Sequence, residues 1–185
     1  MEKTKIGLSL KEAREMALKI SKEDIGVRII VPHHSNHNQF LFVRNREDKR
    51  MGKRGGWGLP GGGVDKGETP YAAAMRELWE EAGFEKGDYH LSKKVFGYKK
   101  IGLFDTSRWF YVLIFSASLE LSAELKNFKP DPDGDIVNRQ WFNPETDFKI
   151  GFNGLCLKGS EEPVYADHVE TIRKYMIGLL SKKIR

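Results

Sequence analysis

The sequence contains a single cysteine, Cys156, so no disulfide can form within the chain. It has no apolar run long enough to cross a membrane as a helix, and residues 1–20 carry too many charges for a signal peptide. Internal repeats and low-complexity tracts are also missing. These absences argue against a disulfide-rich scaffold, a membrane-spanning protein and a repeat array, and they favour a reducing, cytoplasmic setting.

The composition that remains is typical of one globular domain spanning 1–185. Hydrophobic residues make up 39% of the 185 residues and charged residues 31%, which is enough apolar material for a core. The net charge of +5 suits polyanionic ligands, but it is too small and too scattered to argue for nucleic acid by itself. A homodimer is compatible with this composition, which does not fix the oligomeric state.

Hydrophobic periodicity predicts strands that alternate with helices, and hence an α/β protein. A capping box at Ser9–Glu12 predicts a helix over 10–21, inside a helical extension at 1–22. Apolar residues at helical spacing over 167–181 predict a C-terminal helix within 166–183, and Asp167 and His168 near its start are interpreted as capping and surface groups. We expect strands at 25–31, 39–44, 91–102, 108–119 and 136–142, and an irregular segment at 143–165 that has room for a short hairpin.

The stretch from Gly61 to Phe84 combines a glycine-rich turn with an acidic helix. Thr69 or Glu68 can cap the start of this helix, Pro70 fits its first turn and Gly83 suits its end. Glu77, Glu80 and Glu81 stand at i, i+3 and i+4, so they share one helix face and repel each other. A hard divalent cation would offset that repulsion, since it binds carboxylate oxygens and backbone carbonyls. A solvated acidic face is the alternative, but the glycines at 61–63 let main-chain carbonyls approach a ligand and favour a site.

This stretch resembles the signature of Nudix hydrolases, G-x5-E-x7-R-E-U-x-E-E-x-G-U, where U is a bulky apolar residue. Residues 57–61 also resemble the usual lead-in to that signature. Nine specified positions over 23 residues are far more specific than a lone GxGxxG, although the signature covers only about an eighth of the chain. The matching residues are Gly62, Glu68, Arg76, Glu77, Leu78, Glu80, Glu81, Gly83 and Phe84.

The resemblance implies a fold and a metal site. The fold is an α/β/α sandwich with a mixed β-sheet between helices. The cofactor is Mg²⁺ or Mn²⁺, with Glu80 and Glu81 as principal ligands and Glu77 as a third ligand or the water-activating base. A backbone carbonyl near Gly61 or Gly62 completes the set of ligands.

Side chains around the metal ligands are candidates for supporting roles. By the resemblance, Arg76 orients a glutamate through an ion pair, and Glu68 is its partner or an outer group of the site. Arg44 directly precedes the basic loop 45–56 and Arg54 lies within it, and such side chains neutralise phosphate oxygens. A solvated, mobile loop is the alternative for this segment.

Two further segments could either contribute to a site or simply form turns. Asp133 and Asp135 lie in a Pro- and Gly-containing segment, where the family often adds another acid and where a simple turn is also expected. Three histidines at 33–37 could bind a transition metal, but no cysteine or carboxylate accompanies them. A hairpin loop is the preferred interpretation of the histidine segment.

These observations predict a divalent-metal-dependent pyrophosphohydrolase. By the resemblance, it would cleave a nucleoside diphosphate linked to another moiety, such as ADP-ribose, a (d)NTP or a dinucleoside polyphosphate. RNA with a 5′-triphosphate is an alternative substrate, less favoured because no long basic arm is visible. A non-catalytic Nudix domain that senses a nucleotide is a second alternative, and the complete set of carboxylates argues against it.

Overall fold

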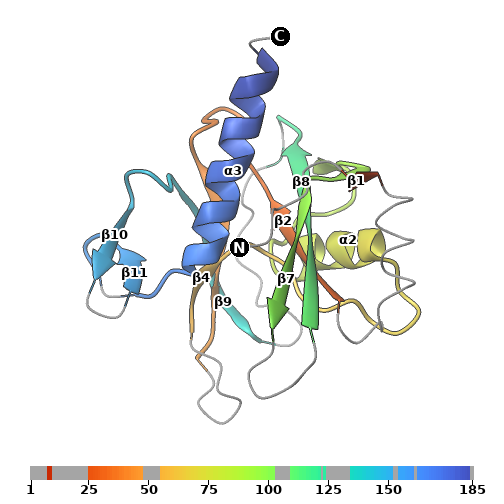
Figure 1. Ribbon diagram of the computed structural model, residues 1–185, viewed down its shortest axis with the longest axis horizontal. Coiled ribbons are helices and arrows are strands. Elements are labelled where there is room, and N and C mark those ends of the chain that lie inside the picture. Colours follow the sequence, from red (N-terminus) through yellow and green to blue (C-terminus); the bar gives the residue numbers. More distant parts are fainter. Residues whose placement is uncertain are drawn as a thin grey trace. The chain divides into compact units, whose positions relative to one another are not determined.

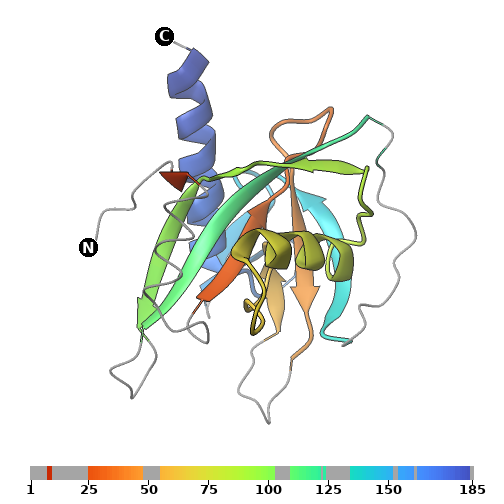
Figure 2. The same ribbon diagram turned by 90° about the vertical axis from the view of Figure 1, so that its right-hand side faces the viewer.

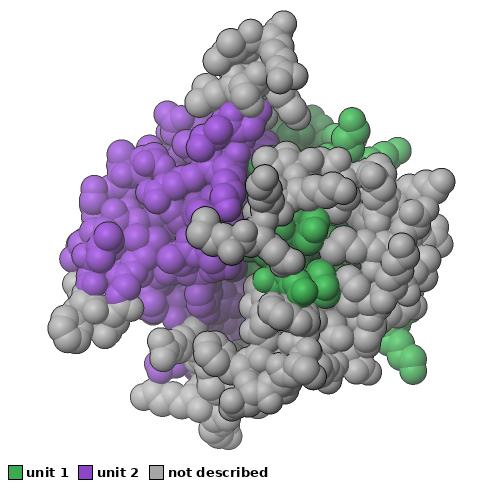
Figure 3. Space-filling model, in the orientation of Figure 1, with its two compact units in different colours: residues 1–31, 60–125 green, residues 32–59, 126–185 purple. Residues whose placement is uncertain are grey.

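A computed structural model describes residues 8–9, 25–47, 55–102, 109–121, 123, 134–151, 154–160 and 162–183. The chain divides into two compact units, coloured separately in Figure 3. Unit 1 comprises residues 1–31 and 60–125, and unit 2 comprises residues 32–59 and 126–185.

Unit 1 contains a mixed sheet, as expected. Strand β2 (Ile25–Ile30) pairs in parallel with β8 (Trp109–Leu119), and β5 (Tyr89–Leu91) and β7 (Gly97–Gly102) pair with β8 in antiparallel fashion. Strands β1 (Leu8–Ser9) and β6 (Lys94–Val95) pair in antiparallel fashion and form a separate two-stranded sheet. Val112 to Phe115 on β8 are buried, which confirms that this apolar run crosses the core.

Helix α2 (Pro70–Glu80) lies against β2 in Figures 1 and 2. The Thr69 hydroxyl accepts a hydrogen bond from Ala72 N at 3.1 Å, which makes Thr69 the N-cap, and Pro70 fits the first turn. Gly83 ends the helix with a positive φ of 70°, and Phe84 N bonds back to Leu78 O at 3.0 Å. The sequence signals at both ends of this helix are therefore confirmed.

Unit 2 is built on an antiparallel sheet in which β3 (Phe40–Asn45) lies between β4 (Gly56–Gly58) and β9 (Ile136–Phe142). Phe42, Phe142 and Phe148 pack with their ring centroids 5.2–5.8 Å apart. Strands β10 (Phe148–Gly151) and β11 (Gly154–Leu157) form a hairpin, and α3 (Ala166–Lys183) closes the unit.

The structure differs from the sequence predictions in three places. The strand expected over 91–102 is divided among β5, β6 and β7, and the three-residue strand β4 was not predicted. Leu8 and Ser9, inside the helical extension predicted at 1–22, form β1, and the helix predicted over 10–21 falls outside the described residues. Neither α2 nor α3, the two helices in the described part of the chain, has the length and apolar character needed to span a membrane.

Candidate active site

The candidate site lies in unit 1, where the glycine turn at 60–64 runs along the free edge of β2. Val27 N donates to Gly62 O at 2.8 Å, Ile29 N to Pro60 O at 2.9 Å and Val64 N to Ile25 O at 3.0 Å. The turn is therefore held as an added strand, because its backbone completes the hydrogen bonds of β2.

Close approach explains two of the glycines. Gly61 has a φ of +141°, and a Cβ there would clash with Val27 O. A Cβ on Gly62 would clash with Glu77 Oε1, so the Glu77 carboxylate packs directly on the turn. Position 61 therefore requires glycine, whereas a side chain at position 62 would push the Glu77 carboxylate off the turn.

The carboxylates of α2 face this turn in different ways. Glu77 is only 5% exposed, and burial raises the pKa of its carboxyl. The Arg76 guanidinium opposes that shift in pKa. Glu81 Oε2 accepts a hydrogen bond from Gly61 N at 2.7 Å, which ties the end of the helix to the turn.

Arg76 sits at the centre of the acidic cluster. Its Nη1 lies 2.8 Å from Glu77 Oε1 and 2.9 Å from Glu80 Oε2. Its Nη2 donates to Gly63 O at 2.8 Å and to Glu68 Oε2 at 3.1 Å. The hydrogen bond to Glu68 raises the pKa of Arg76, so the guanidinium stays charged. One planar cation thus joins three carboxylates to the turn.

The oxygen-rich donor set fits a hard divalent cation. Carboxylate oxygens of Glu77 and Glu80 already surround a positive group, and the carbonyls of the glycine turn lie beside them. Among the described residues, no three acidic, histidine or cysteine side chains converge as a ready-made metal cage. Arg76 contacts both Glu77 and Glu80, and Glu81 accepts a hydrogen bond from Gly61 N. A cation bound at these carboxylates would therefore share Glu77 and Glu80 with Arg76.

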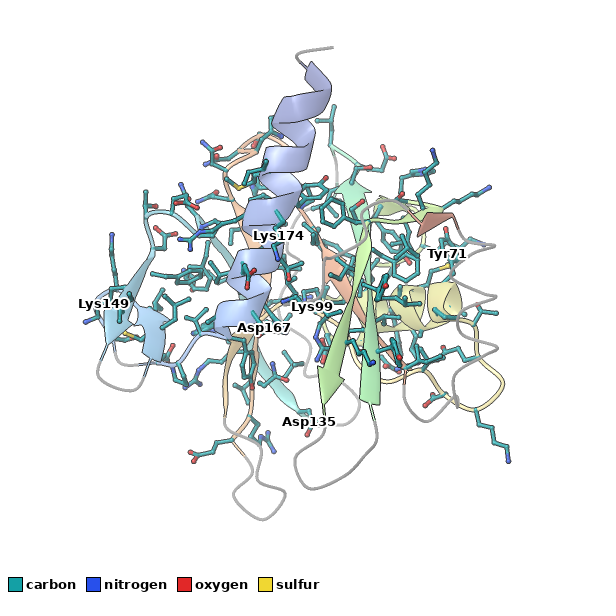
Figure 4. All side chains as sticks on the ribbon, in the orientation of Figure 1. Tyr71, Lys99, Asp135, Lys149, Asp167 and Lys174 are labelled. Carbon is teal, nitrogen blue, oxygen red and sulfur yellow. The ribbon has the colours of Figure 1, made fainter. Side chains whose placement is uncertain are left out.

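The candidates outside the signature belong to unit 2, and Asp135 among them is labelled in Figure 4. Arg44, on β3 in unit 2, forms an ion pair with Glu162 at 3.0 Å. Asp135 is exposed and its backbone carbonyl accepts from Arg46 N at 2.6 Å. Arg54 and Asp133 fall outside the described residues.

The histidine segment serves a turn. His33 Nδ1 accepts hydrogen bonds from Ser35 N at 3.2 Å and Asn36 N at 3.1 Å. His33 N in turn donates to Gln39 O at 2.9 Å, which closes the loop between β2 and β3. These bonds support the loop interpretation, because the ring nitrogen that they use is not available to a metal.

Sequence reasoning missed several residues around β4, above all Glu162 and His168. Trp57 Nε1 donates to Glu162 Oε2 at 2.7 Å across 105 residues of chain, and Leu59 N donates to His168 Nδ1 at 2.9 Å across 109 residues. His168 was interpreted as a capping or surface group, yet its side chain is 14% exposed. Glycine at both Gly56 and Gly58 of β4 was the available signal, because alternate glycines in a strand indicate close approach of another segment.

The chain is similar in sequence to known proteins. The sequence pattern of the NUDIX domain family matches residues 24–149. An RNA pyrophosphohydrolase of Rickettsia conorii (strain ATCC VR-613 / Malish 7) is 40% identical over 73 residues, which cover 40% of this chain and 41% of that protein. The chain spans less than half the length of the curated relatives that it matches.

Two solved structures share the fold. The NUDIX domain of Shewanella oneidensis NrtR complexed with ADP ribose superimposes with a TM-score of 0.56 at 16% identity, covering 91% of this chain and 98% of that one. A C. elegans Ap4A hydrolase in a binary complex gives a TM-score of 0.55 at 19% identity, covering 85% of this chain and 96% of that one. At such low sequence identity, the similarity shows that the fold is shared.

Proposed function

Because the chain belongs to the NUDIX domain family, we propose that it is a divalent-metal-dependent pyrophosphohydrolase. It would break the phosphoric anhydride of a nucleoside diphosphate linked to another moiety, by attack of water on phosphorus. One observation carries the proposal: Glu77 and Glu81 both contact a glycine turn, and a single guanidinium bridges Glu77 to Glu80. The repulsion among these carboxylates is tolerated because cationic charge is held at their centre.

The residues would divide the work as follows. Glu80 and Glu81 would be the main ligands of Mg²⁺ or Mn²⁺, which supplies charge neutralisation of the phosphate oxygens and activation of water when bound. Glu77, whose burial raises its pKa, would be a further ligand or the base that takes a proton from water. The carbonyl of Gly61 or Gly62 would add a backbone oxygen. Arg76 would orient the carboxylates, with Glu68 holding its other edge.

Substrate recognition would come from residues outside the signature. Arg44 and Arg54 stay predictions for this role, and Asp133 and Asp135 stay candidates for a further acid of the site. Small nucleotide derivatives are the first substrate class, since structures of the same fold include a domain complexed with ADP ribose and an Ap4A hydrolase. Cytoplasmic location and a homodimer stay predictions as well.

RNA with a 5′-triphosphate is a second candidate substrate. One observation favours it: the local sequence identity is to proteins named RNA pyrophosphohydrolase, in one of them 54% over 43 residues. That match covers 23% of this chain and 25% of the relative, so it supports shared chemistry more than a shared RNA surface.

A phosphate-release screen of the purified chain tests the proposal. The panel contains ADP-ribose, (d)NTPs, dinucleoside polyphosphates and 5′-triphosphate RNA, each with Mg²⁺ or Mn²⁺ and each with chelator. We expect metal-dependent turnover of at least one substrate, and its loss in Glu81→Gln. Nucleotide binding without turnover, with metal bound, would support the sensor alternative instead.

A further inference from the structure

The C-terminal clamp, which we define as residues Glu162 to His168, runs along β4 inside unit 2. Trp57 N donates to Pro163 O at 2.8 Å, and Tyr165 N donates back to Trp57 O at 2.9 Å. Trp57 and Val164 form a parallel bridge at the same place. The clamp therefore acts as a further strand beside β4, on the edge that β3 leaves open.

Side chains fasten both ends of this contact. At the beginning, Glu162 receives the Trp57 indole N–H at 2.7 Å and the Arg44 guanidinium at 3.0 Å. At the end, His168 in the first turn of α3 receives Leu59 N–H at 2.9 Å on its Nδ1. Because Nδ1 accepts a backbone hydrogen, the ring must be unprotonated at that nitrogen.

The strand is shaped for the clamp. A Cβ on Gly56 would lie 2.9 Å from Pro163 O, and a Cβ on Gly58 would lie 2.6 Å from both His168 Nδ1 and the Tyr165 ring. These distances are too short for a Cβ atom, so a side chain at either glycine would push the clamp away from β4. The His168 contact is thus part of a built interface, and it is separate from the capping role that its sequence position suggests.

From these contacts we propose that His168 is a positioning residue for the reaction. Its Nδ1 accepts a hydrogen bond from Leu59 N. Only Pro60 separates Leu59 from Gly61, and the proline ring fixes the φ angle of Pro60. Leu59 is bonded directly to Pro60, the first residue of the glycine turn, so a displaced Leu59 would pull on that turn through the chain itself. A small displacement of that backbone would move the turn relative to the carboxylates with which it shares the site, and small displacements are costly in catalysis. The inference rests on the proposed hydrolase function for its catalytic part only.

Three substitutions separate the hydrogen bond from the bulk of the ring. His168→Leu removes the acceptor and keeps much of the volume. His168→Asn places a carbonyl oxygen where Nδ1 lies, and His168→Gln moves that oxygen one bond further away. His37→Leu, in the exposed loop between β2 and β3, is the matched control for loss of a histidine.

The first measurement is hydrogen exchange in the peptide that contains Leu59, which needs no substrate. We expect about tenfold faster exchange in His168→Leu and His168→Gln, and near wild-type exchange in His168→Asn and His37→Leu. Unchanged exchange in a folded His168→Leu would overturn the proposal, even if the wild type hydrolyses nothing in the panel. The absence of turnover in the wild type would overturn the proposed function and leave this measurement intact.

The second measurement is steady-state hydrolysis of the best substrate. We expect kcat to fall about 10- to 100-fold in His168→Leu with little change in KM, and to be largely restored in His168→Asn. Thermal unfolding identifies variants that merely fail to fold, and the comparison of His168→Asn with His168→Gln stays informative when both fold. Equal kcat in these two variants, or wild-type kcat in His168→Leu, would overturn the positioning role.

Discussion

The carboxylate cluster of unit 1 and the C-terminal clamp of unit 2 are assembled in opposite ways. Glu77, Glu80 and Arg76 are neighbours because one helix places them there, so their contacts span one to four residues of chain. The clamp instead joins Trp57 to Glu162 and Leu59 to His168, over 105 and 109 residues. The chemistry is thus encoded locally, whereas the position of the backbone that leads into it depends on distant segments.

Glu80→Gln is the sharpest test of the carboxylate cluster, whose contacts are local in sequence. Removing one negative oxygen should lower hydrolysis by about 10³-fold, since a carboxylate that neutralises phosphate charge through a metal is worth several kcal/mol. The fold should survive, because the amide oxygen of glutamine can still accept from Arg76. Initial rates with Mg²⁺ measure the effect, and Glu85→Gln, on an exposed position past the helix, is the control. Wild-type rates in Glu80→Gln would remove this residue from the site.

Arg76→Ala tests whether the cluster needs its own cation. Without Arg76, the carboxylates of Glu68, Glu77 and Glu80 repel each other, so the free energy of unfolding should fall by about 2–3 kcal/mol. Added Mg²⁺ should raise the melting temperature of Arg76→Ala more than that of the wild type, because the competing guanidinium is gone. Urea unfolding with and without Mg²⁺ measures both effects, and Lys66→Ala is the exposed control. Equal stabilisation by Mg²⁺ in both proteins would contradict the competition.

The long-range contacts of the C-terminal clamp are tested at Glu162, where the clamp begins. Glu162→Ala leaves the buried Trp57 indole N–H without its acceptor, which should cost about 1–2 kcal/mol of unfolding free energy. Glu162→Gln should recover most of that loss, because an amide oxygen accepts the same hydrogen and the ion pair with Arg44 is partly exposed. Equal destabilisation in the two variants would show that charge, and not the indole bond, holds the clamp.

The smallest effect concerns His33, a local contact within unit 2. Burial and the neighbouring His34 lower the pKa of His33 in the folded protein. Its folded pKa then lies below its unfolded value, so the unfolded chain binds more protons and stability falls as pH drops below about 6.5. Chemical unfolding between pH 7.5 and pH 5 should show this slope in the wild type and a smaller one in His33→Asn, which keeps an acceptor for the turn. A slope unaffected by the substitution would assign it to another group.

The same division explains what the sequence could and could not predict. The caps of α2 and the grouping of its glutamates follow from spacing alone, and both were predicted. Arg76 was expected to orient a glutamate, and in the structure it contacts Glu77, Glu80 and Glu68. Strand β4 was missed because three residues with two glycines have little strand propensity, and tertiary pairing overrides that preference. His168 was missed because nothing in its local sequence shows that Leu59 lies beside it.

The glycine turn also covers one edge of β2, and this matters for the solubility of the protein. Residues 60–64 occupy hydrogen-bonding positions of a β-branched, apolar strand whose other side is paired with β8. An open edge of that composition is a template for association between chains. Substitutions that displace the turn, such as a side chain at Gly61, would therefore produce aggregating protein before they produce a merely slower enzyme.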